Sequence, residues 1–244
     1  TCPDQVAPGF TLPGAFAEYI AVPYDHNLAV LPKAMSPALA AGLGCRVTTA
    51  WHALTGRAQC RAGEWVAVHG TGGIGLSALL LARALGARVV VVDVVAEKLS
   101  HALGHGADAA VNARDEDAAQ RIKEITGGGA DISIEALGIA ETTNASIECL
   151  KPLGRHVQVG LPTGKTARME INMNAVYMGN LALFGTRGMP AYRFPSLLSL
   201  IEGGHVDLSP LLSREVALSD VSAELAAFNG PTAPGVAVVT DFKG

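Results

Sequence analysis

Short apolar runs alternate with mixed, helix-like segments through the central part of the chain. Short runs rich in valine and isoleucine are typical of strands buried on both faces of a parallel sheet. The predicted strands are Trp65–His69, Val89–Val92, Ala109–Val111, Ile132–Leu137, Arg155–Leu161 and Leu181–Gly185, and the predicted helices lie near 74–85, 96–104, 116–126 and 140–151. Strands joined by helical crossovers predict an α/β fold with a doubly wound parallel sheet.

The two flanks of this region do not continue the alternation. Phe16–Val22 has the apolar–polar alternation that predicts a half-buried strand. Residues 37–44 are rich in alanine and predict a closely packed helix. The elements predicted after residue 187 are helices near 193–203 and at Ser219–Phe228, and a strand at Val236–Val239. We expect this tail to fold back onto the N-terminal segment.

A glycine-rich turn joins the first predicted strand to the following helix. It covers residues 70–75 and reads GTGGIG, a GxGxxG pattern. Gly70 permits the tight turn, Gly72 lets the backbone approach a pyrophosphate, and Gly75 lets the helix pack closely on the sheet. The amides at the helix start, those of Gly73 and Ile74, would hold the phosphates with the help of the helix dipole. The motif predicts a dinucleotide site, and the alternative is a glycine-rich turn without a ligand.

An acidic residue after the second predicted strand bears on the choice of cofactor. Asp93 lies 18 residues after Gly75, where a carboxylate accepts hydrogen bonds from the adenosine ribose hydroxyls. A carboxylate there repels the extra phosphate of NADP, and Val94 and Val95 bring no positive charge. Lys98, one turn into the next helix, is either a ribose contact or a solvated lysine. The sequence therefore favours NAD over NADP.

Composition limits the kinds of partner. The chain has 244 residues, 49% hydrophobic and 16% charged, which is enough for a substantial core in one or two domains. Its net charge of −4 argues against a nucleic-acid partner, and no apolar run is long enough to predict a membrane span. Widely spaced cysteines without a CxxC pair are typical of a cytoplasmic enzyme with reduced thiols. They are Cys2, Cys45, Cys60 and Cys149.

Further motifs lie on both sides of the glycine turn in a specific order. They read PGAFAEY at 13–19, CRVTTAWHAL at 45–54, GEWVAVHG at 63–70, GAD at 106–108 and GRHVQVG at 154–160. In this order they resemble the medium-chain zinc-dependent alcohol dehydrogenases over nearly the whole chain. The resemblance implies a Rossmann NAD-binding domain inserted in a GroES-like catalytic domain. The implied division is a GroES-like remnant at 1–45, the Rossmann domain at 46–187 and the return to the catalytic domain at 188–244.

The resemblance also implies roles for particular residues. Cys45 matches a cysteine ligand of the catalytic zinc, and Thr49 matches a threonine that approaches the nicotinamide. Gly160 and Leu161, at the end of the fifth predicted strand, should line the nicotinamide side. Cys2 matches the last of four closely spaced cysteines that hold a structural zinc, with a free thiol as the alternative.

The implied reaction is hydride exchange between an alcohol or aldehyde and NAD, with zinc present in the intact protein. The other catalytic ligands and the proton relay of the family precede the matching region, so we expect the chain to lack the N-terminal part of the catalytic domain and to be inactive alone. Gly185–Arg187 should also line the nicotinamide side. Gly235–Val238 has no basic residue where many relatives place an arginine for the pyrophosphate. The strand Leu181–Gly185 is expected to pair with a second subunit in a homo-oligomer.

Two alternatives stay open, the second of them from another class of protein. One is a zinc-free quinone or enoyl reductase, against which Cys45 and Asp93 both count. The other is a non-catalytic NAD-binding fragment. His52 and His69 are interpreted as structural, and Glu135 on the fourth predicted strand either faces the nicotinamide or is structural. The sequence does not identify which alcohol or aldehyde is the substrate.

Overall fold

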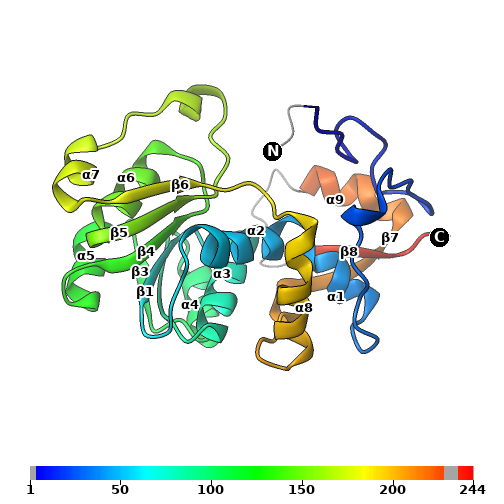
Figure 1. The fold of residues 1–244 in the computed structure, drawn as a ribbon, viewed down its shortest axis with the longest axis horizontal. Coiled ribbons are helices and arrows are strands. Elements are labelled where there is room, and N and C mark those ends of the chain that lie inside the picture. Colours follow the sequence, from blue (N-terminus) through cyan, green and yellow to red (C-terminus); the bar gives the residue numbers. More distant parts are fainter. Residues whose placement is uncertain (1–3, 228–235, 244) are drawn as a thin grey trace.

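The computed structural model describes residues 4–227 and 236–243, whose elements form two groups (Figure 1). The larger group is built on a six-stranded sheet. Its strands are β1 (Trp65–His69), β2 (Arg88–Asp93), β3 (Ala109–Asn112), β4 (Ala130–Glu135), β5 (Leu150–Gln158) and β6 (Ala182–Gly185). Their order is β3-β2-β1-β4-β5-β6, and all neighbours are parallel. This confirms the predicted doubly wound Rossmann sheet, whose strand order reverses direction between β1 and β4.

Helices cover both faces of this sheet. They are α3 (Gly73–Ala84), α4 (Ala96–Gly104), α5 (Ala118–Thr126), α6 (Ala140–Glu148) and α7 (Met173–Gly179). Val66 and Val68 of β1 belong to one core with Leu79 of α3, whereas Ala67 belongs to a second core with Ile122 of α5. Because successive strand residues face opposite cores, the central strands read as continuous apolar runs. Among the described helices, none has the length and apolar character needed to cross a membrane.

The strands β4 and β5 both end before their predicted ends. The carboxylate of Glu135 accepts hydrogen bonds from the amides of Leu137, at 2.9 Å, and Gly138, at 2.8 and 3.0 Å. The carbonyl of Glu135 accepts the amides of Val159, at 2.9 Å, and Gly160, at 2.8 Å. These bonds turn the backbone away from the sheet after β4 and again after β5, although the apolar sequence pattern continues beyond both strands.

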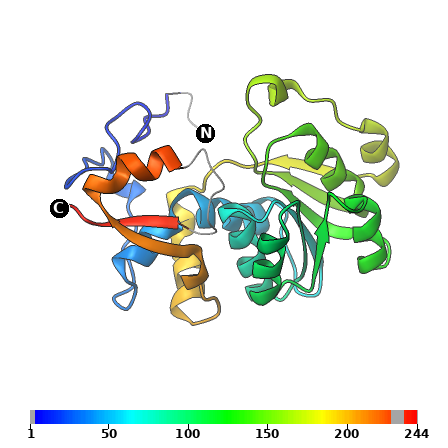
Figure 2. The ribbon, with the colours of Figure 1, turned by 180° about the vertical axis from the view of Figure 1, so that it is seen from behind.

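The smaller group surrounds a two-stranded parallel sheet. It contains α1 (Pro37–Gly42), β7 (Leu212–Ala217), α9 (Val221–Ala227) and β8 (Val236–Asp241). The remaining helices of this part of the chain, η2 (Leu43–Val47), α2 (Thr48–Trp51), η3 (His52–Arg57) and α8 (Phe194–Glu202), contribute to the core of the large sheet, and η2 and α2 pack on α3. Figure 2 shows β7, β8 and α9 together, on the side away from the large sheet. The strands β7 and β8 both pack against α1. The tail therefore folds onto an N-terminal helix, as expected.

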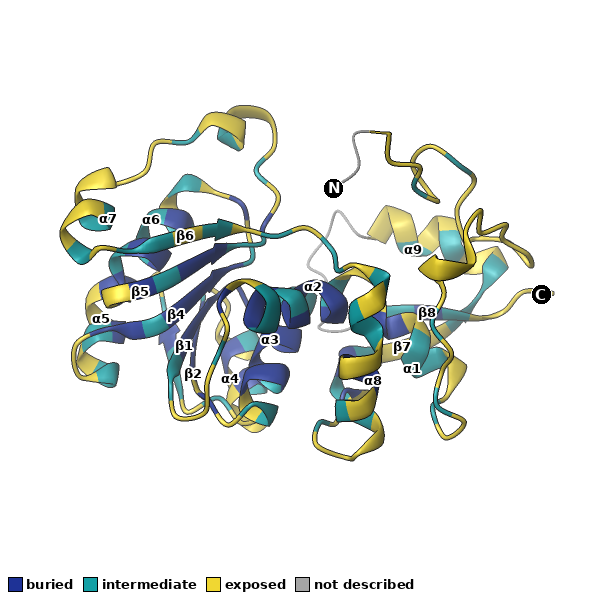
Figure 3. Ribbon diagram, in the orientation of Figure 1, coloured by how far each residue is buried: buried dark blue, intermediate teal, exposed yellow. Residues whose placement is uncertain are grey.

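The predicted strand at Phe16–Val22 is wrong. This segment forms bends and irregular backbone, with Phe16 63% exposed and Tyr19 89% exposed. Within residues 4–227 and 236–243, the structure pairs no strand with it. A strand needs a hydrogen-bonding neighbour, and apolar alternation alone does not supply one. Figure 3 shows the contrast between this exposed N-terminal segment and the buried large sheet.

Candidate functional site

The glycine turn lies at the carboxyl edge of the sheet, between β1 and α3. Gly70 has a φ of +91°, and a Cβ there would lie 2.8 Å from the Leu137 side chain. A Cβ on Gly75 would lie 1.8 Å from the carbonyl oxygen of Gly70, so the helix start leaves no room for a side chain. Gly72 is exposed, and its Cβ position has no heavy atom within 4 Å. Packing within the chain explains Gly70 and Gly75, whereas Gly72 leaves space for a ligand to approach the backbone.

Asp93 ends β2 and is bonded to the glycine turn. Its Oδ2 accepts the amide of Thr71 at 2.8 Å and the hydroxyl of Thr71 at 2.7 Å. Its Oδ1 accepts the amides of Val94, at 2.8 Å, and Val95, at 3.1 Å. Burial raises the pKa of Asp93, but the bonds from Thr71 and Val94 and the charge of Lys98 outweigh burial and hold the pKa below its ordinary value. The carboxylate is therefore negative at neutral pH beside the turn.

Two buried hydroxyls lie in segments expected to line the nicotinamide side. The Oγ1 of Thr49, on α2, and the Oγ1 of Thr186, directly after β6, have no hydrogen-bond partner among the described residues. Thr49 is only 3% exposed. Leaving a buried hydroxyl unpaired is costly, so a bound polar group that pairs with these hydroxyls would stabilise the structure. These orphaned atoms fit a dinucleotide at this edge.

The turn after β5 lies against the turn after β4. A Cβ on Gly160 would lie 2.2 Å from the amide nitrogen of Gly138, so the two loops make backbone contact. Leu161 is 71% exposed. The structure therefore places Gly160 inside the packing and Leu161 at the surface, on the carboxyl side of the sheet.

Glu135 serves as an internal anchor for these two turns. It is 0% exposed, and besides the amides of Leu137 and Gly138 it accepts the hydroxyl of Thr142, at 2.6 Å, and the side-chain amide of Gln158. Gln158 also donates to the carbonyl of Gly160 at 3.0 Å. Of the two readings of Glu135, the structure supports the structural one, because its carboxylate is already paired within the chain.

The buried histidines are likewise structural. Burial, the larger cause, and the proximity of His156 together lower the pKa of His69 to about 3. Burial also lowers the pKa of His156 to about 4, against a hydrogen bond with Gln158 that raises it. The Nε2 of His69 lies 3.7 Å from the Sγ of Cys149, whose pKa burial raises to about 12. All three groups are therefore neutral at neutral pH and serve the core.

His52 lies beside Arg193. A Cβ on Gly56 would lie 2.3 Å from the Nδ1 of His52 and 2.9 Å from Nη1 of Arg193, which brings the two side chains to the same glycine. Burial lowers the pKa of His52, and the charges of Arg193 and Arg57 lower it further. Burial and the two neighbouring cations favour the neutral form of this histidine, as expected of a structural residue.

The predicted zinc ligand Cys45 lies at a kink in the chain. Gly44 and Cys45 leave the helical conformation inside η2, and Cys45 has a φ of +41°, a value uncommon for a residue with a side chain. Cys45 is exposed. Among the described residues, no three His, Cys, Asp or Glu side chains are grouped so that they could hold a metal. Cys2 lies outside the described residues.

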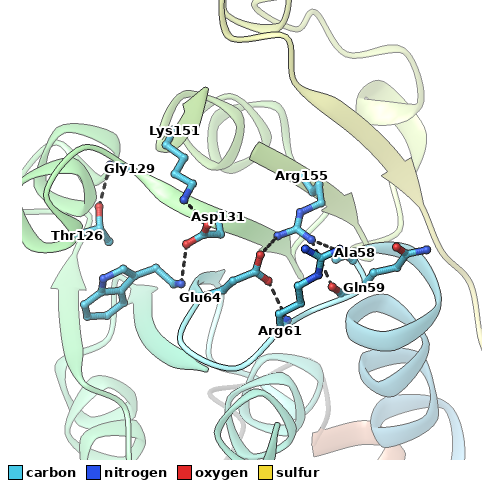
Figure 4. A network of polar contacts seen from close by, with 10 residues as sticks. Ala58, Gln59, Arg61, Glu64, Thr126, Gly129, Asp131, Lys151 and Arg155 are labelled. Atoms are coloured by element: carbon cyan, nitrogen blue, oxygen red, sulfur yellow. Dashed lines mark hydrogen bonds and ion pairs between the residues drawn. The ribbon is translucent and has the colours of Figure 1, made fainter. Parts of the chain in front are cut away.

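A hollow of about 620 Å³ lies at the opposite, amino edge of the sheet. Figure 4 shows the polar network beside it, in which Arg155 pairs with Glu64 at 2.5 Å and Lys151 pairs with Asp131. Asp131 also accepts the backbone amide of Trp65 at 2.8 Å. These charges are paired with one another and tie the starts of β1, β4 and β5. The hollow is remote from the glycine turn, which leaves from the other end of β1.

A doubly wound sheet, a glycine turn and an acid at the end of β2 together define a protein of the Rossmann class. The profile of the family described as zinc-binding dehydrogenase matches residues 73–203, more than half of the chain. The chain belongs to this family of zinc-binding dehydrogenases.

Individual relatives agree with this assignment. The chain is 36% identical over 161 residues to an alcohol dehydrogenase of Geobacillus stearothermophilus, covering 66% of this chain and 47% of that protein. It is 26% identical over 225 residues to D-arabitol-phosphate dehydrogenase of Enterococcus avium, covering 90% and 62%. The crystal structure of an NAD-dependent alcohol dehydrogenase matches with a TM-score of 0.83 and 26% identity, covering 93% of this chain and 65% of that chain. The chain thus spans about half to two thirds of these relatives.

Proposed function

We propose that this chain binds NAD at the carboxyl edge of the large sheet and belongs to an enzyme that exchanges a hydride between an alcohol or aldehyde and NAD. The observation that carries the proposal is the Asp93 carboxylate, held negative beside an open glycine turn. The names of the relatives, an alcohol dehydrogenase and an NAD-dependent alcohol dehydrogenase among them, support it. When bound, NAD supplies the carbon that accepts or donates the hydride.

The described residues would divide the work of holding the dinucleotide. The turn at 70–75 and the start of α3 would hold the diphosphate, and Asp93 would hold the adenosine ribose. The four acceptor positions of the Asp93 carboxylate are engaged within the chain. A ribose hydroxyl therefore has to share or replace the bonds from Val94 and Val95, which lie in an exposed segment. Lys98, half-buried at the start of α4, adds positive charge near this ribose position.

The nicotinamide end would lie between β5 and α2. Thr49 and Thr186 offer buried hydroxyls for its amide group, and Gly160 and Leu161 would line its side. We also infer that Cys45 is one ligand of a catalytic zinc. The described residues do not form a complete zinc site, so this part of the proposal is confined to Cys45, with Cys2 proposed for a structural zinc.

The division into 1–45, 46–187 and 188–244 is part of the same proposal. It is supported by the end of the large sheet at β6 and by the packing of β7 and β8 on α1. We further propose a cytoplasmic enzyme, since the described cysteines are unpaired. A small alcohol or aldehyde is the proposed partner, and a D-arabitol-phosphate dehydrogenase among the relatives extends this class to polyol phosphates.

The experiment is calorimetric titration of the chain with NAD and with NADP, with zinc content measured on the same sample. We expect NAD to bind at least about tenfold more tightly than NADP, because Asp93 repels the second phosphate. The variant Asp93→Asn should lower the affinity for NAD and reduce the preference for NAD over NADP. The control variant Asp115→Asn, which removes an exposed carboxylate near the end of β3, should leave the affinity and the preference unchanged. Equal binding of the two cofactors would contradict the role of Asp93, and binding of neither would contradict the proposed function.

The edge strand β6 is the proposed site of homo-oligomer formation. Leu183 on this strand is 37% exposed, and β6 pairs with β5 on one side only. An exposed strand edge presents unpaired backbone groups that a second copy can satisfy. Sedimentation should show a dimer that Leu183→Lys weakens. A monomer at all concentrations would contradict this assignment.

A further inference from the structure

Arg46 reaches from η2 to the start of α3. A Cβ placed on Gly73 would lie 2.6 Å from Cδ, 2.9 Å from Nε and 3.0 Å from Nη1 of Arg46. The guanidinium therefore lies directly against the backbone of Gly73. The kink at Gly44 and Cys45 makes this possible, because it redirects the chain just before Arg46 and brings η2 against α3.

The surroundings of Gly73 are suited to an anion. Gly73 is the first residue of α3, and among the described residues no side chain caps this end of the helix. The first amides of a helix lack partners within it and carry the positive end of its dipole. Gly72, the next residue toward β1, has open space at its Cβ position. Positive charge, backbone donors and space therefore meet at one point.

We propose that Arg46 binds the diphosphate of the dinucleotide, together with the first amides of α3. This inference rests on the proposed function and adds a residue to it. A guanidinium presents two parallel donors that match two oxygens of a phosphate, and this geometry makes arginine well suited to the task. A side chain at position 73 would require the guanidinium to shift from this place.

The test is calorimetric binding of NAD to the unmodified chain and to Arg46→Ala, Arg46→Lys and Arg88→Ala. Arg88 is the matched control, since it begins β2 at the opposite edge of the sheet and stacks on Trp65 with 4.5 Å between the guanidinium carbon and the ring centroid. We expect Arg46→Ala to lower the affinity for NAD about ten- to one hundredfold. Arg46→Lys keeps the positive charge but loses the two parallel donors of the guanidinium, so its loss of NAD affinity should be smaller than that of Arg46→Ala. Arg88→Ala should change NAD affinity by less than about twofold.

Adenosine, which lacks phosphate, separates a role in binding from a role in folding. Its affinity, measured by ligand-observed NMR, should be the same for the unmodified chain and for Arg46→Ala. An Arg46→Ala chain that binds NAD as tightly as the unmodified chain overturns the inference. Equal weakening of NAD and adenosine also overturns it, because Arg46 would then act on the fold. If the unmodified chain binds no NAD at all, the proposed function itself fails and the inference falls with it.

Discussion

The large sheet and the N-terminal segment differ in how their apolar residues are used. In the large sheet the apolar residues of β1, β2 and β4 are nearly all inaccessible, with Val66, Val90 and Ile132 each 0% exposed. In the N-terminal segment, Phe10 is 92% exposed and Tyr19 is 89% exposed. The sheet encloses its own core because helices cover both of its faces. Apolar alternation predicts a buried element only where the chain also supplies the surface that buries it.

The substitution Gly75→Ala should have the largest effect on stability and on NAD binding, because it disrupts the glycine turn between β1 and α3. Its Cβ would lie 1.8 Å from the carbonyl oxygen of Gly70, so the start of α3 must move away from β1. We expect a loss of about 3 kcal/mol in the free energy of unfolding in urea, and no NAD binding. The control Gly104→Ala changes the last residue of α4, where the Cβ position is open. Equal stability of Gly75→Ala and Gly104→Ala would contradict the packing described for the turn.

The substitution Glu135→Gln should have the next largest effect. In the unmodified chain, Leu137, Gly138 and Gln158 all donate hydrogen bonds to the Glu135 carboxylate. The substitution replaces one acceptor oxygen by an NH₂ group, which is itself a donor. We expect a loss of about 2–3 kcal/mol in the free energy of unfolding. Glu124→Gln, on the exposed face of α5, should cost less than about 0.5 kcal/mol. A stable Glu135→Gln chain with unchanged NAD affinity would show that the two turns do not depend on this carboxylate.

The paired substitution Phe16→Ser and Tyr19→Ser should have the smallest effect on stability. These side chains are largely exposed, so the unfolding of the large sheet should change by less than about 0.5 kcal/mol. Exposed apolar clusters promote association, and light scattering should show that the unmodified chain associates and that the variant associates less. A fully monomeric unmodified chain would contradict this difference between the two regions.

The sheet and its glycine turn could be predicted from the sequence because their patterns are local. The valine runs report burial on both faces, and GTGGIG reports a turn whose geometry few other residues allow. The contacts of Arg46 and Glu135 could not be predicted, because they depend on distant segments. Arg46 reaches Gly73 only through the kink at Cys45, and Glu135 meets a side chain of β5. In the sequence, the only signal for this role of Arg46 is a basic residue next to the motif cysteine Cys45. The direction in which the Arg46 side chain extends could be known only from the structure.

Binding of the dinucleotide at the carboxyl edge can be tested by backbone hydrogen exchange of the chain with and without NAD, read by mass spectrometry. With NAD bound, we expect slower exchange at 70–76 and at 93–98, where the glycine turn, Asp93 and the amides of Val94 and Val95 lie. We expect no change in exchange at 127–129, beside the hollow at the amino edge of the sheet. Protection confined to 127–129, or no protection at 70–76 at a saturating concentration of NAD, would show that the carboxyl edge does not hold the dinucleotide.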